Sequence, residues 1–155
     1  MSDLIYSFDS SSLIHAWRRA YRPRNFPTFW KMMEELIDEK RLKISSEVYK
    51  ELEKKDDDVF LWCKKHKEEM FVDIDDDVQD RVIEIMRLYP RIVDTKSGKS
   101  GGDPFVIAIA SSGEDAMVVV TEENPGGNRI PQICSEEQIQ CINLADLIER
   151  EGWIL

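Results

Sequence analysis

Cysteine and histidine are scarce in this chain of 155 residues. Its three cysteines, Cys63, Cys134 and Cys141, are an odd number without a Cys-x-x-Cys pair, which argues against a disulfide framework. Cys63 and His66 have a spacing that could hold zinc, but a closed zinc site needs four ligands and His15 is the only other histidine. We therefore expect the thiols to be small buried apolar groups.

Long apolar runs are also missing, and none approaches the length of a membrane span. The start of the chain lacks the basic region of a signal peptide, because Asp3 precedes its first apolar run. These features predict a cytoplasmic protein. A chain of this length needs no more than one packed core, so we expect residues 1–155 to form a single domain.

An excess of basic residues is absent as well, since 31 acidic and 21 basic residues give a net charge of −10. This charge argues against a protein that holds nucleic acid by charge alone. It does not exclude a nuclease, because bound metal ions cancel part of the charge of clustered carboxylates. Two groups of basic residues stand out. One is an arginine cluster, Arg18, Arg19, Arg22 and Arg24, and the other is the pair Lys96 and Lys99, which flanks a glycine-rich segment. Solvated surface charge explains each of these residues equally well.

Short apolar runs alternate with amphipathic segments along the chain. The runs predict strands over residues 4–8, 42–44, 70–74, 117–121 and 139–142. Helical spacing predicts helices after Ser10, around 29–37, after Ser45, around 59–62, over 75–88, from Asp103 and over 144–149. Strands that alternate with helices imply a three-layer α/β/α domain, with a mainly parallel central sheet of four to five strands.

Acidic residues fall where such a sheet would end a strand or begin a helix. Asp9 follows the first predicted strand, and Glu122 and Glu123 follow the fourth. Glu47 and Asp103 lie in the first turns of helices that begin on the same side. Because ligands bind outside the carboxyl ends of parallel strands, one rim of the sheet can collect all of these carboxylates. Carboxylates gathered in this way hold divalent metals.

Each of these acids also has a purely structural explanation. Asp103 could be an N-cap, Glu47 a first-turn acid favoured by the helix dipole, and Asp9 a turn residue. Glu122 and Glu123 could simply keep a loop solvated. Taken together the acids are harder to explain as a coincidence, because few others in the chain lie beside an apolar run at a predicted strand end.

Short motifs around these acids resemble those of a known family. They are Ile5-Tyr6-Ser7-Phe8-Asp9-Ser10-Ser11, Ser46-Glu47-Val48, Gly102-Asp103-Pro104 and Val119-Val120-Thr121-Glu122-Glu123. In this order they resemble the motifs of PIN-domain ribonucleases over nearly the whole chain. The resemblance is closest to VapC-like toxins, and among these to a bacterial group known only as a domain of unknown function. The chain departs from the family pattern at the fourth motif, where many members have Thr-Asn-Asp and this chain has Thr121-Glu122-Glu123. Glu123 therefore matches the family's acid by position, and Glu122 is a near alternative.

The resemblance implies a PIN-like fold and a metal-dependent endoribonuclease that hydrolyses RNA phosphodiester bonds. Such a protein would be the toxin of a type II toxin–antitoxin pair, held inactive by an antitoxin protein, and family members often form homodimers. Asp9, Glu47 and Asp103 would bind one Mg²⁺ or Mn²⁺. Glu123, or Glu122 in its place, would help to hold a second ion or the attacking water.

The resemblance also implies supporting roles for other residues. Ser11 and Thr121 match hydroxyls of the family that would orient the carboxylates or a water molecule. The arginine cluster and the segment 94–102 are candidates for steering RNA.

Two alternatives come from other classes of protein. A phosphorylation receiver domain also gathers acids at strand ends, and Asp73 or Asp75 could be its acceptor. It would need a lysine after the last strand, where Ile142-Asn143-Leu144 offers none. A PIN-like module that binds RNA or protein without catalysis is favoured slightly by the Glu122-Glu123 pair and the acidic composition. Metal-dependent RNA cleavage would separate this module from an enzyme.

Overall fold

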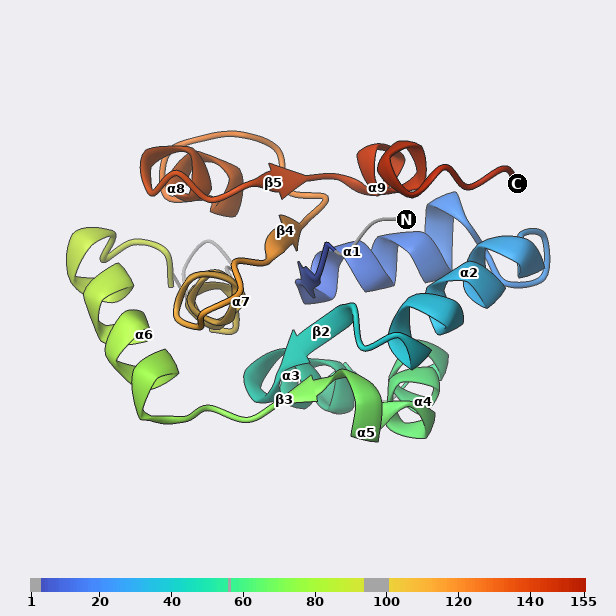
Figure 1. The fold of residues 1–155 in the computed structure, drawn as a ribbon, viewed down its shortest axis with the longest axis horizontal. Helices are drawn as coiled ribbons and strands as arrows, with labels where there is room; N and C mark the ends of the chain where they lie inside the picture. Colours follow the sequence, from blue (N-terminus) through green and yellow to red (C-terminus); the bar gives the residue numbers. More distant parts are fainter. Residues whose placement is uncertain (1–3, 56, 94–100) are drawn as a thin grey trace.

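A parallel β-sheet forms the centre of the computed structural model, which describes residues 4–55, 57–93 and 101–155. Within these residues the strands follow the order β3-β2-β1-β4-β5 and all pair in parallel (Figure 1). They are β1 (Tyr6–Phe8), β2 (Leu42–Ser45), β3 (Phe71–Val72), β4 (Val118–Val120) and β5 (Cys141–Ile142). The structure thus confirms the predicted parallel sheet and puts β1 at its centre.

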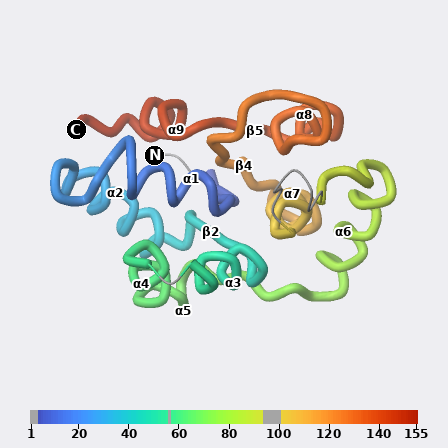
Figure 2. Tube along the Cα trace, turned by 180° about the vertical axis from the view of Figure 1, so that it is seen from behind, coloured from blue at the N-terminus to red at the C-terminus, as the bar shows by residue number. Residues whose placement is uncertain are grey.

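Helices cover both faces of this sheet. They are α1 (Ser10–His15), the π-helical turn η1 (Ala16–Ala20), α2 (Pro27–Asp38), α3 (Ser46–Lys55), α4 (Asp58–Lys65), α5 (Lys67–Met70), α6 (Asp76–Leu88), α7 (Asp103–Ser111), α8 (Ile130–Glu136) and α9 (Leu144–Glu151). Figures 1 and 2 show α1, α2 and α9 on one side of the sheet and α6, α7 and α8 on the other. The three-layer α/β/α architecture is therefore confirmed.

The central strands are buried on both faces, as their uninterrupted apolar runs require. All three residues of β1 and of β4 are buried, and α7 packs against both strands. The one hydroxyl in β1, that of Ser7, donates a hydrogen bond of 2.8 Å to the carbonyl oxygen of Val106 in α7. This bond satisfies a polar group in the core and fixes α7 against the strand from which the site begins.

Side-chain caps define the starts of several helices. Ser45 accepts a hydrogen bond from the Val48 amide at the start of α3, and Asn143 forms a capping box with Asp146 at the start of α9. Asp103 is an exception, because α7 begins at Asp103 itself and Gly102 is the N-cap. The structural explanation of Asp103 as an N-cap is therefore wrong, and its carboxylate is available for another role.

Two further elements differ from the prediction. The third strand is shorter than the predicted 70–74, because Met70 ends the short helix α5. Helix α8 was not predicted, since its seven residues include Pro131 and are too short to show a helical period. Of the described helices, none is both long and apolar enough to cross a membrane.

The strand order also bears on the receiver alternative. Receiver-type flavodoxin-like sheets have the order 2-1-3-4-5, whereas this sheet has the order 3-2-1-4-5. Asp73 and Asp75 follow the edge strand β3, and Asp75 is the N-cap of α6, where it accepts a 2.8 Å hydrogen bond from the Val78 amide. The fold thus offers no support for either residue as a phosphate acceptor.

Candidate functional site

Asp9 lies at the carboxyl end of the central strand and is held by hydrogen bonds on both carboxylate oxygens. Its Oδ1 accepts a bond of 2.8 Å from the Ser12 amide, so Asp9 is also the N-cap of α1. Its Oδ2 accepts bonds from the hydroxyls of Ser11, at 2.7 Å, and Thr121. The side chain is only 2% exposed. Burial raises the pKa of Asp9, and these hydrogen bonds to the charged form counteract the rise.

Asp103 is the second buried aspartate, 6% exposed at the start of α7. Burial, followed by the negative charges of Glu123, Asp9 and Glu51, raises the pKa of Asp103 to about 9. The neutral carboxyl can also share a hydrogen bond with Glu123. The structure therefore brings the carboxylates of Asp9, Asp103 and Glu123 into one electrostatic cluster, to which Glu51 also belongs.

Glu123 and Glu122 face different parts of the molecule. Glu123 interacts with Asp103 and also accepts a 2.9 Å hydrogen bond from the Ile130 amide at the start of α8. Its own amide donates to Thr121 Oγ1 at 3.1 Å. Glu122 instead accepts a 3.0 Å hydrogen bond from the Leu144 amide at the start of α9. Of the two candidates for the fourth acid, the structure brings only Glu123 to Asp103.

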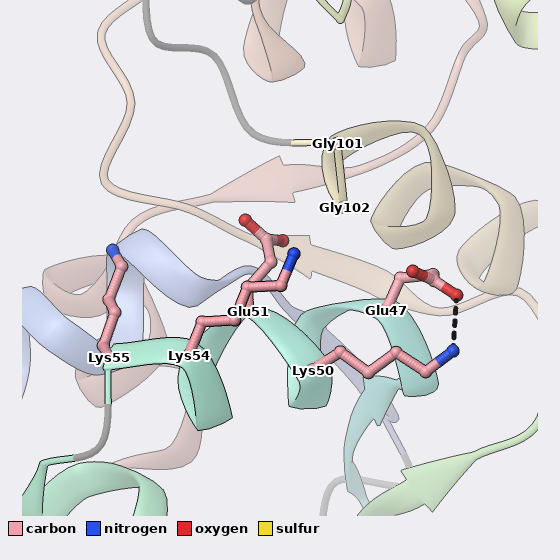
Figure 3. A pocket seen from close by; sticks show the side chains of 7 residues that line it. All are labelled: Glu47, Lys50, Glu51, Lys54, Lys55, Gly101 and Gly102. Atoms are coloured by element: carbon pink, nitrogen blue, oxygen red, sulfur yellow. Dashed lines mark hydrogen bonds and ion pairs between the residues drawn. The ribbon is translucent and has the colours of Figure 1, made fainter.

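Glu47 is, besides Glu122, a predicted ligand that the structure does not bring to this cluster. Its side chain is 35% exposed and forms an ion pair of 3.3 Å with Lys50, whereas Glu51 acts on the pKa of Asp103. Figure 3 shows both glutamates on α3, one turn apart, with the Glu51 carboxylate directed towards Gly101 and Gly102. One carboxylate oxygen of Glu51, Oε1, is buried.

Sequence reasoning missed Glu51, although a signal was present. Glu47 and Glu51 are four residues apart, and such residues lie on one face of a helix. Either of them could therefore face the strand ends. The prediction of Glu47 rested on its place in the first turn and on the resemblance of Ser46-Glu47-Val48 to a family motif, and not on the face that the two acids share.

The candidate basic residues lie apart from the acids. The arginines belong to η1 and the segment that follows it, at the far end of α1 from Asp9 (Figure 1). Arg18 forms an ion pair with Asp57, and Arg22 donates to the Arg18 carbonyl oxygen at 2.9 Å; Arg19 and Arg24 are exposed. Lys96 and Lys99 lie outside the described residues.

The thiols are not among the groups that raise the pKa of Asp103. Cys63 is fully buried, and burial raises its pKa to about 12, which suppresses the reactive thiolate. Cys134 is also buried, and Cys141 is half-buried. The expectation of buried thiols is thus confirmed for two of the three cysteines.

The donor set fits a hard divalent cation in its chemistry, since every acid in the cluster offers carboxylate oxygens. In the part of the chain that the structure describes, no three acidic, histidine or cysteine side chains are close enough to coordinate one ion as they stand. The raised pKa of Asp103 shows that the acids nevertheless act on one another. A cation among them would relieve this repulsion and favour the ionised form of Asp103.

Comparison with known proteins adds one finding to this geometry. No curated protein matches the chain. A family model, whose description states no activity, matches residues 6–155 and so covers almost all of the sequence. The chain therefore belongs to the family described as "Domain of unknown function (DUF4411)".

Proposed function

We propose that this protein is a Mg²⁺- or Mn²⁺-dependent endoribonuclease that hydrolyses RNA phosphodiester bonds. The observation that carries the proposal is Asp103, a buried carboxyl with a pKa of about 9, surrounded by the charges of Asp9, Glu51 and Glu123. Groups so strongly perturbed by burial and by specific charged neighbours are concentrated at functional sites. Their place at the carboxyl edge of a parallel sheet is where ligands bind in such folds.

Four carboxylates would hold the metal in this proposal. They are Asp9, Glu51, Asp103 and Glu123. Glu51 replaces the predicted Glu47, and Glu122 is left out because it contacts the start of α9. Divalent cations bound there would offset the charge of the phosphodiester and stabilise the entering and leaving oxygens. The donors are hard oxygen ligands of the kind that Mg²⁺ and Mn²⁺ prefer.

The chain's own residues would position these ligands. Ser11 and Thr121 both donate to Asp9 Oδ2, and the Ser12 amide holds Oδ1, so the carboxylate cannot turn. Glu123 is held in turn by the Ile130 amide. Fixed in this way, Glu123 can orient the attacking water and accept its proton while the bond from phosphorus to the leaving oxygen breaks.

The wider biological setting follows from the resemblance to VapC-like toxins. We propose that the enzyme is the toxin of a type II toxin–antitoxin pair, that it acts in the cytoplasm, and that an antitoxin protein inhibits it. A homodimer belongs to the same proposal. A growth assay tests this setting, because expression of the chain should arrest growth and co-expression of its antitoxin should restore it.

RNA cleavage by the purified protein tests the enzymatic proposal. We expect cleavage with Mg²⁺ or Mn²⁺, and none with a chelator. Asp103→Asn removes a charged oxygen ligand at almost constant volume and should abolish the activity. If this variant cleaves RNA as well as the parent protein does, the assignment is wrong.

A binding module without catalysis is the second candidate. Two observations favour it: a glutamate occupies the fourth position, and the described residues do not include three ligands close enough for one ion. The same assay separates the two functions, because a binding module would retain RNA or protein without cutting RNA at any metal concentration.

A further inference from the structure

A row of lysines on α3 lies directly beside the acidic cluster. These residues, Lys50, Lys54 and Lys55, are called the α3 lysine row below. They line a pocket of about 340 Å³ together with Glu47, Glu51, Gly101 and Gly102. Figure 3 shows α3 on one side of this pocket and the start of α7 on the other, with Lys54 and Lys55 projecting on the side of Glu51.

The pocket adjoins the acidic cluster. Glu51 lines the pocket and is also one of the charges that raise the pKa of Asp103. Gly102, on the opposite wall, directly precedes Asp103 in the chain. Consider a polymer with regularly spaced phosphates that places one phosphate at Asp103. Its neighbouring phosphate would therefore lie in this pocket.

The lysines supply positive charge where a polyanion needs it. The chain as a whole carries a charge of −10, and the acids at the cluster would repel phosphates. Lys54 and Lys55 are exposed, and they lie within about 6 Å of Glu51 along the helix axis, at 1.5 Å per residue. The row thus borders the acids within one helical turn.

The existing ion pair in the pocket does not prevent this use. Lys50 and Glu47 are 3.3 Å apart, and their side chains are 62% and 35% exposed. Exposed pairs of this kind contribute little to stability, because water and salt screen the two charges. Lys50 can therefore exchange Glu47 for a phosphate at small cost.

The opposite wall leaves room for a polymer backbone. Among the residues that the structure describes, a Cβ atom added at Gly101 would meet no other atom within 4 Å. The absence of a side chain lets a ligand approach the main chain closely. The charged wall on α3 is thus paired with two glycines, Gly101 and Gly102, on the other side of the pocket.

We propose that the α3 lysine row binds the phosphodiester backbone of single-stranded RNA, next to the phosphate that is cut. The inference rests on the proposed nuclease function and adds to it the subsite that holds the flanking nucleotide. Contacts of lysine with phosphate position a strand without reading its bases. The row should accordingly contribute affinity that depends on salt and not on base sequence.

Salt-dependent RNA binding tests this subsite in the full chain. Fluorescence anisotropy with a short labelled single-stranded RNA of mixed sequence is measured on the Asp103→Asn protein, so that the probe stays intact. Each phosphate contact with a single strand contributes about 0.7 to the slope of log K against log salt. Lys54→Gln/Lys55→Gln should therefore reduce that slope by roughly 1.4, and Lys54→Arg/Lys55→Arg should retain it.

A matched control lies on the neighbouring helix. Lys64 and Lys65 occupy the last turn of α4, as Lys54 and Lys55 occupy that of α3, and they line a different pocket, of about 480 Å³. Lys64→Gln/Lys65→Gln makes the same change in net charge and should leave the slope unaltered. Circular dichroism checks that each variant is folded.

Two results would overturn the subsite. One is an unchanged slope in Lys54→Gln/Lys55→Gln, and the other is an equal loss in the Lys64→Gln/Lys65→Gln control, which would mean that only net charge matters. Cleavage by the parent protein with Mn²⁺ is measured separately. If the parent protein cleaves RNA but Lys54→Gln/Lys55→Gln does not change the salt slope, only the subsite is overturned. If the parent protein does not cleave RNA, both the proposed nuclease function and the placement of the subsite beside a cut phosphate are overturned, whatever the salt slopes are.

Discussion

Asp103 carries its negative charge at a cost in the folded protein. In an unfolded chain its pKa would be near 3.8, whereas in the folded protein burial and the neighbouring acids raise it to about 9. Folding at neutral pH therefore takes up a proton. The stability that the protonated Asp103 contributes is fully present below pH 4 and is lost as the pH rises through about 9.

The first prediction concerns Asp103→Asn in metal-free protein. Because asparagine resembles the neutral carboxyl and cannot ionise, the substitution should raise the free energy of unfolding at pH 7 by roughly 4 kcal/mol, which is about 1.4 kcal/mol for each of the roughly three pKa units between 3.8 and 7. Urea denaturation with a chelator present, repeated from pH 5 to about 9, measures this difference. Parallel stability curves for the two proteins over that range would refute the raised pKa.

Glu47 and Glu51 provide the second prediction, because they are matched acids on one helix. The charge of Glu51 helps to raise the pKa of Asp103, while Glu47 pairs with Lys50. Glu51→Gln should reduce metal-dependent RNA cleavage by roughly 10–100-fold, the range seen when groups that support a metal site are removed. Glu47→Gln should stay close to the parent activity. The opposite ranking would restore Glu47 as the ligand.

These two glutamates show where sequence reasoning reaches its limit at the residue scale. Residues four apart lie on one face of a helix, so spacing alone cannot decide which of them faces α7. The same limit applied to Glu122 and Glu123, which the fold separates because one contacts the start of α9 and the other the start of α8. Asp9 and Asp103 were predictable, since each directly adjoins an apolar run.

The starts of helices organise the acids at the scale of elements. The first turn of α1 holds Asp9, that of α8 holds Glu123, and α7 begins with Asp103 itself. Backbone amides at a helix start favour negative charge. The site is thus built from helix starts that the parallel sheet brings to one edge.

Asp75 allows a prediction that separates a structural cap from a functional acid. Asp75→Ala removes the bond to the Val78 amide at the start of α6 and should cost about 1 kcal/mol of stability. In a domain of this size that loss lowers Tm by about 2–4 °C. RNA cleavage should be unaffected.

Calorimetry and the cleavage assay together check the role of Asp75. Asn143→Ala, which removes the cap of α9, is the matched control and should have a similar effect on Tm. Loss of cleavage in Asp75→Ala alone would give Asp75 a functional role that the geometry does not support.

Most elements were predictable because their apolar patterns are strong. Buried parallel strands need continuous apolar runs, and the runs at 4–8 and 117–121 contain β1 and β4. Helix α8 was not predictable, because its seven residues make only about two turns. Its buried side chains come from a segment that begins with Ile130-Pro131 and is too short to show a helical period. The order of the strands was not predicted either, since pairing depends on contacts between distant segments.

On the scale of the whole molecule, the sheet joins distant parts of the sequence into one acidic site. Asp9 and Thr121, which are in direct contact, are separated by 112 residues. The acids Asp9, Asp103 and Glu123, which come from three of the four motifs, are therefore neighbours in space as well as successive along the chain. The α3 lysine row adds positive charge beside this site in a molecule whose net charge is −10.

Calorimetric titration with Mn²⁺ tests the central claim, that the acidic cluster is a divalent metal site. A cation that binds there must displace the proton of Asp103, so the parent protein at pH 7 should bind Mn²⁺ and release about one proton. Titrations in buffers of different ionisation enthalpy count that proton, and Asp103→Asn should bind weakly and release none. Equal binding by the two proteins, or binding without proton release, would contradict the account.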